Sequence, residues 1–145
     1  MKLSKKAEYA LRALLALAAW PESDPQSVRA LSAEHELPRK FLETVMRELR
    51  QAGLVESAPG KQGGYTLARA PASVTLGQVF DAVGFAAADA RPAADPGDVV
   101  DVFLAGLGSE VERLLRDTTL DDLLRRSSTG RALRWADTCM DGGGI

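Results

Sequence analysis

Hydrophobic residues recur at helical spacing through the first third of the chain. Residues 4–19 place alanines and leucines on one face of a predicted helix, and Ser4 is suited to be its N-cap. A shorter helix is predicted over 27–34, and a third over 38–52. The apolar positions of this third helix fall at i, i+3, i+4 and i+7, at Leu42, Val45, Met46 and Leu49. The pattern therefore predicts three helices, the third strongly amphipathic.

A hairpin is predicted directly after these helices. Gly53 is a typical helix terminator, and residues 54–58 and 65–68 are typical of short strands. Between them lies the glycine-rich segment 59–64. Three helices followed by a hairpin with a glycine-rich tip are typical of a winged helix-turn-helix.

The second half of the chain predicts further helices. Thr75 and Gln78 have capping-box spacing, which predicts a helix over 76–83. Helical spacing returns over 98–116, although Gly106 and Gly108 each weaken that helix by about 1 kcal/mol. Its apolar positions form a candidate dimerisation face of Val100, Phe103, Leu104, Leu107, Val111, Leu114 and Leu115. A last short helix is predicted over 119–127.

These elements predict a mainly α fold with a small β-hairpin: a winged helix-turn-helix followed by a long C-terminal dimerisation helix. We expect a DNA-binding domain over 1–84, a loop or linker over 85–97, dimerisation helices over 98–127 and a tail over 128–145.

Composition excludes several other classes of protein. No apolar run reaches the roughly 20 residues needed to cross a bilayer, so we expect a cytoplasmic protein without a membrane partner. One cysteine, Cys139, excludes an internal disulfide and any multi-cysteine metal site within one chain, and His35 is the one histidine. We therefore expect no metal and no cofactor.

The charge is divided along the chain. The net charge is −2, but residues 1–70 carry 11 Lys and Arg against 8 Asp and Glu, or +3, whereas residues 71–145 carry 7 against 12, or −5. A weakly basic first half is compatible with DNA binding there.

The outer side of the 38–52 helix carries the candidate DNA-binding residues, namely Arg39, Lys40, Glu43, Thr44, Arg47 and Arg50. The cations can neutralise phosphate or reach guanine, Thr44 can contact a thymine methyl group, and Glu43 can accept from cytosine N4. Taken from the residues alone, an ion pair of Glu43 with Arg39 or Arg47 is the simpler interpretation of that carboxylate.

The predicted hairpin adds candidate contacts at Lys61, Gln62, Gly63, Gly64 and Tyr65. The glycines permit a close backbone approach, Lys61 and Gln62 supply donors, and the Tyr65 hydroxyl can reach a phosphate. The alternative is an ordinary hairpin with Tyr65 packed on the core.

Several short segments together resemble the Rrf-two (Rrf2) family of bacterial winged helix-turn-helix regulators, which includes IscR, NsrR and CymR. In chain order they are Lys2-Leu3-Ser4, Tyr9-Ala10-Leu11-Arg12-Ala13-Leu14, Phe41-Leu42-Glu43, Leu49-Arg50-Gln51-Ala52-Gly53-Leu54-Val55, Gly63-Gly64-Tyr65-Thr66-Leu67-Ala68 and Val74-Thr75-Leu76-Gly77-Gln78-Val79.

The resemblance implies a homodimer that binds double-stranded DNA at a partly palindromic operator and acts as a repressor. It also implies that Glu43 selects a base and that Ser4 and Tyr9 contact phosphate, whereas the residues alone suggest an N-cap and core packing.

The sequence departs from the family pattern in two places. Relatives that hold an iron-sulfur cluster use three cysteines before the dimerisation helix, but residues 85–97 contain none. Glu8 stands where some relatives have an acidic ligand, and without those cysteines it is expected to be a surface or structural carboxylate. In the hairpin, Pro59 and Lys61-Gln62 replace the family's usual arginine and Pro-Gly.

Other functions are less consistent with these residues. An enzyme is not expected, because His35 lies between Glu34 and Glu36 on a predicted surface turn and Cys139 lies in the tail. A protein-interaction module that has lost DNA binding remains an alternative. So does control by oxidation of Cys139, or by an unknown small-molecule or protein effector.

Overall fold

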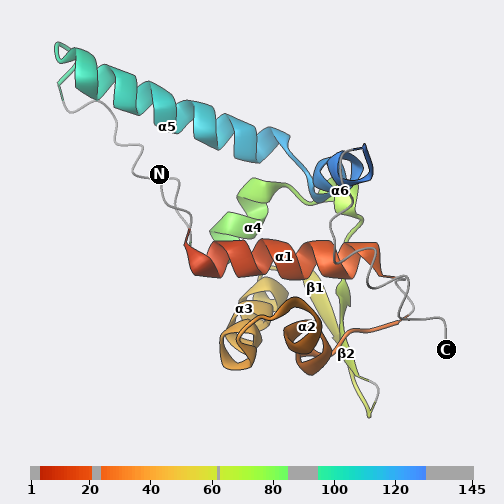
Figure 1. The fold of residues 1–145 in the computed structure, drawn as a ribbon. Helices are drawn as coiled ribbons and strands as arrows, with labels where there is room; N and C mark the ends of the chain where they lie inside the picture. The colour runs from red at the N-terminus through yellow and green to blue at the C-terminus, as the bar shows by residue number, and fades with distance from the viewer. Residues whose placement is uncertain (1–3, 21–23, 62, 85–94, 130–145) are drawn as a thin grey trace.

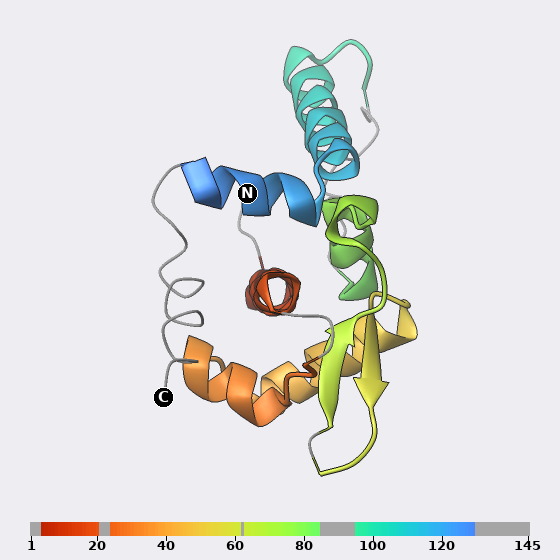
Figure 2. The same ribbon diagram turned by 90° about the vertical axis from the view of Figure 1, so that its right-hand side faces the viewer.

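The computed structural model describes residues 4–20, 24–61, 63–84 and 95–129. Its elements, in order, are α1 (Lys5–Ala19), α2 (Val28–His35), α3 (Arg39–Gln51), β1 (Val55–Ala58), β2 (Gly64–Leu67), the 3-10 turn η1 (Pro71–Ser73), α4 (Leu76–Ala82), α5 (Val99–Asp117) and α6 (Leu120–Thr129). Helix α1 runs through the centre, with α2 and α3 on one side of it and α4 and α6 on the other (Figures 1 and 2). The predicted fold class, mainly helical with one two-stranded antiparallel hairpin, is confirmed.

Side-chain caps define where the helices begin. The Ala7 N–H donates to Ser4 Oγ at 3.1 Å, and the Ala30 N–H donates to Ser27 Oγ at 3.0 Å. The predicted capping box of Thr75 and Gln78 is present at the start of α4. Each cap satisfies an amide that lacks a partner within its own helix, so these polar residues fix the helix boundaries.

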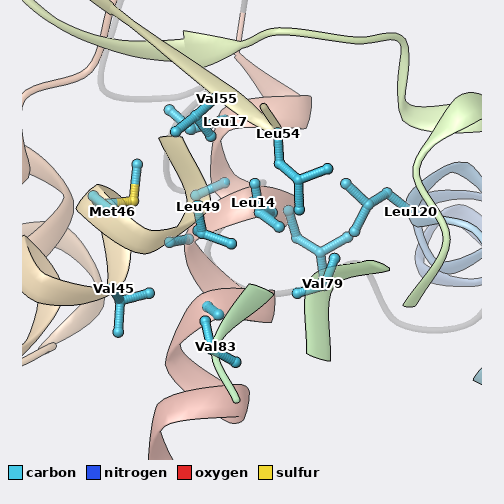
Figure 3. Packing of buried hydrophobic residues seen from close by; sticks show 14 of the residues in the cluster. Leu14, Leu17, Val45, Met46, Leu49, Leu54, Val55, Val79, Val83 and Leu120 are labelled. Atoms are coloured by element: carbon cyan, nitrogen blue, oxygen red, sulfur yellow. The ribbon is translucent and has the colours of Figure 1, made fainter. Parts of the chain in front are cut away.

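One hydrophobic core joins the elements around α1. Leu14 of α1, Leu49 of α3, Val79 of α4 and Leu120 of α6 are each 0% exposed (Figure 3). Burying one such side chain contributes about 1.5–3 kcal/mol, so the contact of α3 with α1 is strongly stabilised. The first residue of α6 thus shares the core of the N-terminal helices.

The turn between α2 and α3 depends on one strained residue. Glu36 has φ +52° and ψ +37°, in the left-handed region that glycine adopts more readily. This conformation turns the chain so that Leu37, 5% exposed, enters the core. Ser32 fixes the turn from both sides: its carbonyl accepts from the Leu37 N–H at 3.1 Å, and its hydroxyl donates to the Leu37 carbonyl.

The hairpin has a third participant that the hydrophobic pattern did not predict. Strands β1 and β2 pair antiparallel, with Val55 opposite Leu67 and Ala58 opposite Gly64. Gln26, just before α2, pairs with Tyr65: the Gln26 N–H donates to the Tyr65 carbonyl at 3.0 Å, and the Tyr65 N–H donates back at 2.8 Å. The hairpin is therefore joined to the beginning of α2.

Helix α5 is continuous through Gly106 and Gly108 and extends away from the other elements as an arm (Figures 1 and 2). Asp98 caps it, and its carboxylate accepts from the Val100 N–H at 2.8 Å. Among the described residues, no helix combines the length and apolar character required to cross a bilayer.

The strained turn gives a stability prediction. Glu36→Gly should raise the free energy of unfolding by about 1 kcal/mol, because glycine adopts the left-handed conformation without steric cost. The matched control, Ala33→Gly within α2, should lower it by about 1 kcal/mol. Urea denaturation of both full-length variants checks this. A Glu36→Gly variant less stable than wild type would show that the turn is not strained.

Candidate nucleic-acid interface

The outer side of α3 carries six of the predicted DNA-binding residues, and these six are exposed. We call Arg39, Lys40, Glu43, Thr44, Arg47 and Arg50 the recognition face. The four apolar residues of the opposite side are each 0% exposed: Leu42, Val45, Met46 and Leu49. Because the inner side is fully used by the core, the recognition face is held towards solvent.

Two contacts fix how α3 lies on α1. The rings of Tyr9 and Phe41 meet edge to face, with centroids 5.5 Å apart. The Lys6 Nζ donates to Glu48 Oε1 at 2.7 Å, at a half-buried site that links positions 42 residues apart. Neither contact could be predicted from local sequence patterns, because each joins two different helices. Both resist rotation of α3 about its axis.

On the recognition face, Arg39 and Glu43 form an ion pair. The Arg39 Nε lies 3.4 Å from Glu43 Oε1, with the side chains 62% and 47% exposed. Such an exposed i,i+4 pair contributes only about 0.3–0.5 kcal/mol, so DNA can displace it at little cost. The exposed Thr44 donates its hydroxyl to the Lys40 carbonyl at 3.4 Å, a long and therefore weak bond.

The beginning of α1 carries a second polar group. Ser4 is the exposed N-cap of the helix. The Lys5 Nζ and the Arg12 guanidinium lie 3.3 and 3.1 Å from the two carboxylate oxygens of Glu8. The hydrogen bonds from Lys5 and then Arg12 hold the pKa of Glu8 below its ordinary value. Glu8 is thus an ionised carboxylate held between two cations.

The hairpin presents Lys61 as an exposed cation next to Gly60, whose φ is +108°. Gln62 lies outside the described residues. Tyr65 is half-buried against the core, which agrees with the packing alternative for its ring.

Gly64 has a reason within the fold to be glycine. A Cβ there would lie 2.7 Å from the Ser27 nitrogen and still closer to the Gln26 carbonyl group. Gly63 is similarly close, with a Cβ 2.8 Å from the Gly60 carbonyl oxygen. The two glycines allow the hairpin to approach its neighbouring backbone.

The arm carries a separate exposed apolar surface. We call Val100, Phe103, Leu104, Leu107 and Leu114 the arm face; they are exposed by 46–67%. Val111 is half-buried, and Leu115 packs partly against the chain's own core.

The side chains that could bind a metal ion or act as an acid or base do not form a cluster among the described residues. His35 ends α2 and is half-buried, which differs from the surface turn expected from sequence because Leu37 draws the turn into the core. Burial lowers the pKa of His35, Glu34 opposes that shift and Arg12 reinforces it. Within the described ranges no three His, Cys, Asp or Glu side chains are grouped to hold a metal ion. Cys139 lies outside those ranges.

Comparison with known proteins places this arrangement in a family. A family model described as "Rrf2: Iron-dependent Transcriptional regulator" matches residues 3–126. The chain belongs to the Rrf2 family. Rrf2 proteins are DNA-binding transcription regulators and not enzymes. The class of protein predicted from the sequence is therefore confirmed.

Relatives of this Rrf2 protein match it over different lengths. The HTH-type transcriptional regulator ORF2 of Azotobacter vinelandii is 30% identical over 99% of this chain and 91% of its own length. The regulator slr0846 of Synechocystis is 42% identical over 57% of this chain, and this chain spans only 56% of that relative.

Solved structures confirm the fold. CymR, the global cysteine regulator of B. subtilis, superposes with a TM-score of 0.78 at 28% identity, covering 87% of this chain and 98% of CymR. The T. potens IscR superposes with a TM-score of 0.76 at 27% identity, covering 90% and 91%. The winged helix-turn-helix of this Rrf2 protein is thus shared with solved relatives.

The iron dependence in the family's description does not fit the donors of this chain. A cluster held by cysteines needs several thiolates, and the sequence has one cysteine. Glu8, the position from which the family resemblance would take an acidic ligand, is already held by Lys5 and Arg12. The residues of this Rrf2 protein therefore do not fit a three-cysteine cluster.

The contact of Gly64 with Gln26 gives a prediction. Gly64→Ala should lower the free energy of unfolding by about 1–3 kcal/mol, because the added methyl group overlaps backbone that cannot move aside. Gly77→Ala is the control, since its Cβ would lie at an ordinary 3.5 Å from the Leu115 carbonyl oxygen. Thermal or urea unfolding of the full chain measures both. Equal stability of Gly64→Ala and wild type would contradict the close approach.

Proposed function

We propose that this Rrf2 protein is a sequence-specific repressor that binds a partly palindromic operator as a homodimer, without an iron-sulfur cluster. The observation that carries this proposal is the recognition face: six polar or charged side chains, all exposed, on a helix whose other side is completely buried. A helix with cations and hydrogen-bonding groups on its exposed side fits the DNA major groove.

The residues of the recognition face have complementary roles. Arg47 and Arg50 neutralise phosphates flanking the groove, and Lys40 near the start of α3 reaches either phosphate or a base edge. Glu43 adds a negative charge, which weakens general attraction to DNA. In our proposal Glu43 leaves Arg39 on binding and accepts from a cytosine N4 amine, which frees the Arg39 guanidinium for a phosphate or guanine.

Contacts outside α3 orient the protein on the duplex. Ser4 accepts from the Ala7 N–H, but its hydroxyl still has a proton to donate to a phosphate. In our proposal Lys61 of the hairpin meets the neighbouring groove, and Gln62 and the backbone of Gly63 and Gly64 add further contacts. Tyr9 acts mainly through Phe41, by holding α3 in position.

The arm supplies the dimer contact. Leu104, Leu107 and Leu114 are each about half exposed on a helix that projects from the body. An apolar stripe of this size on a solvent-exposed helix is unfavourable in water, and a second copy of the same helix covers it symmetrically. Val100 and Phe103 extend the stripe, Val111 continues it at helical spacing between Leu107 and Leu114, and Leu115 borders it where the helix packs partly against the core.

Repression is the simplest outcome of this binding, because a dimer that occupies DNA over a promoter blocks polymerase without any further contact. Regulation without a cluster is proposed from the donor set: one cysteine per chain and a Glu8 carboxylate engaged by cations.

The base-selecting role of Glu43 is tested by exchange on the recognition face. Glu43→Ala should relax sequence preference more than it lowers total affinity, whereas Arg47→Ala should weaken binding to all duplexes. Removing the base contact should reduce discrimination at one base pair by about 1–3 kcal/mol, or roughly 5- to 150-fold.

The measurement is fluorescence anisotropy with a duplex recovered from a randomised library and with single-base variants of it. Arg113→Ala is the control, since it removes an exposed arginine on the arm that pairs with Glu110. Unchanged discrimination by the Glu43→Ala protein would exclude the base-selecting role.

The dimer contact is tested by charge placed on the arm. Leu104→Glu should raise the dimer dissociation constant by at least about 100-fold, because it removes one buried leucine from each subunit and adds two like charges. The control Val102→Glu alters an exposed apolar residue on the other side of α5. Sedimentation equilibrium distinguishes the two. If both variants stay as dimeric as wild type, the arm face is not the dimer contact.

A further inference from the structure

The base of the arm is tied to the body by two backbone hydrogen bonds. The Leu76 N–H donates to the Thr118 carbonyl at 2.9 Å, and the Leu120 N–H donates to the Val74 carbonyl at 3.0 Å. Between them, Thr75 and Thr119 face each other as an isolated antiparallel pair. We call this pairing of residues 74–76 with 118–120 the bridge.

Each of the two segments of the bridge contains the N-terminal cap of a helix. The Thr119 N–H and hydroxyl both donate to Asp122 Oδ2, at 2.8 and 2.9 Å, and the Asp122 N–H donates to Thr119 Oγ1 at 3.1 Å. The bonds from Thr119 hold the pKa of Asp122 below its ordinary value. In the other segment, Thr75 and Gln78 make the equivalent reciprocal cap at the start of α4. The caps hold each segment in the extended conformation that the bridge requires.

The bridge is anchored in the core. Val74 and Leu120 are 0% exposed and Thr118 is 6% exposed. Helix α4 lies against the last turn of the arm, since a Cβ on Gly77 would be 3.5 Å from the Leu115 carbonyl oxygen. Beyond this base, the arm face is exposed. The arm therefore cannot tilt against the body without breaking the bridge or withdrawing Leu120 from the core.

We propose that the bridge sets the half-site spacing that the dimer accepts, with Asp122 as a positioning residue for that spacing. This inference rests on the proposed function, because it requires two recognition faces joined through their arms. If the arms are rigidly attached, the two faces have one separation and one relative rotation. One base pair more or less between half-sites moves them by about 3.4 Å and about 35°, too far for both faces to enter their grooves.

The strength of the bridge also determines how much affinity the dimer loses on a duplex with the wrong half-site spacing. A dimer on a mismatched duplex either releases one half-site or bends at the base of an arm, and the change with the smaller free-energy cost determines the affinity lost. Weakening the bridge lowers the free-energy cost of bending. It should therefore improve relative binding to mismatched spacings while leaving the matched spacing nearly unchanged.

The experiment varies the spacer of a duplex selected from a randomised library by the wild-type chain. Spacers shorter or longer by one base pair are compared with the selected one by anisotropy. Asp122→Ala should reduce the preference for the selected spacing by about fivefold, the size expected for the loss of one N-cap. Asp121→Ala is the matched control: an acidic residue of the same helical turn that pairs with Arg125 and does not cap.

Two further variants keep the test decisive. Asp122→Asn retains an oxygen that accepts from Thr119, so it should retain most of the spacing preference. Thr119→Val removes the hydroxyl from the same cap and should behave like Asp122→Ala, which matters if the alanine variant fails to fold.

The outcomes separate this inference from the proposed function. Equal loss of affinity at every spacing in Asp122→Ala and Thr119→Val would assign the bridge a purely structural role and overturn the inference. A wild-type protein that binds the selected half-sites at all three spacings equally would also overturn it, with DNA binding intact. A wild-type protein that selects no duplex at low salt would instead contradict the proposed function itself.

Discussion

The packing of α3 against α1 decides which side chains of this helix face solvent, and the proposed DNA contacts depend on it. Leu42, Val45, Met46 and Leu49 have no exposed surface, so the helix has one rotational setting in which its apolar side is satisfied. A helix advances about 100° per residue, and a shift of one position would bury arginine and expose leucine. The Tyr9 to Phe41 contact and the Lys6 to Glu48 ion pair reinforce that setting from either side. The set of side chains that the proposed function assigns to DNA is therefore a consequence of core packing.

The same core positions the hairpin and the arm. Gln26 pairs with Tyr65 immediately before α2, so the hairpin is fixed relative to the helix-turn-helix. Leu120 enters the core immediately after α5, so the arm is fixed relative to both. In the proposed dimer two recognition faces meet one duplex. This rigidity favours that binding, because a flexible attachment would have to lose conformational entropy when the complex forms.

The hydrophobic pattern predicted the helices, the hairpin and the inner side of α3, because these follow from local periodicity and capping. It also separated the recognition face from the core, since that division is a property of one helix. What it missed joins residues distant in the chain: Lys6 to Glu48, Gln26 to Tyr65, and the bridge at Thr75 and Thr119. Backbone hydrogen bonds between distant segments constrain the identity of the side chains only weakly, so the sequence pattern does not predict them. Gly64 was noted as a glycine, but its closeness to Gln26 emerged only in three dimensions.

The most direct test of the account is the stoichiometry of the wild-type chain on DNA, measured by sedimentation velocity with a labelled palindromic duplex recovered from a randomised library. The account predicts a dimer in free solution and two chains per duplex, with an affinity that falls steeply as salt is raised because phosphate contacts release counterions. A chain that stays monomeric and selects no duplex from the library at low salt would contradict it.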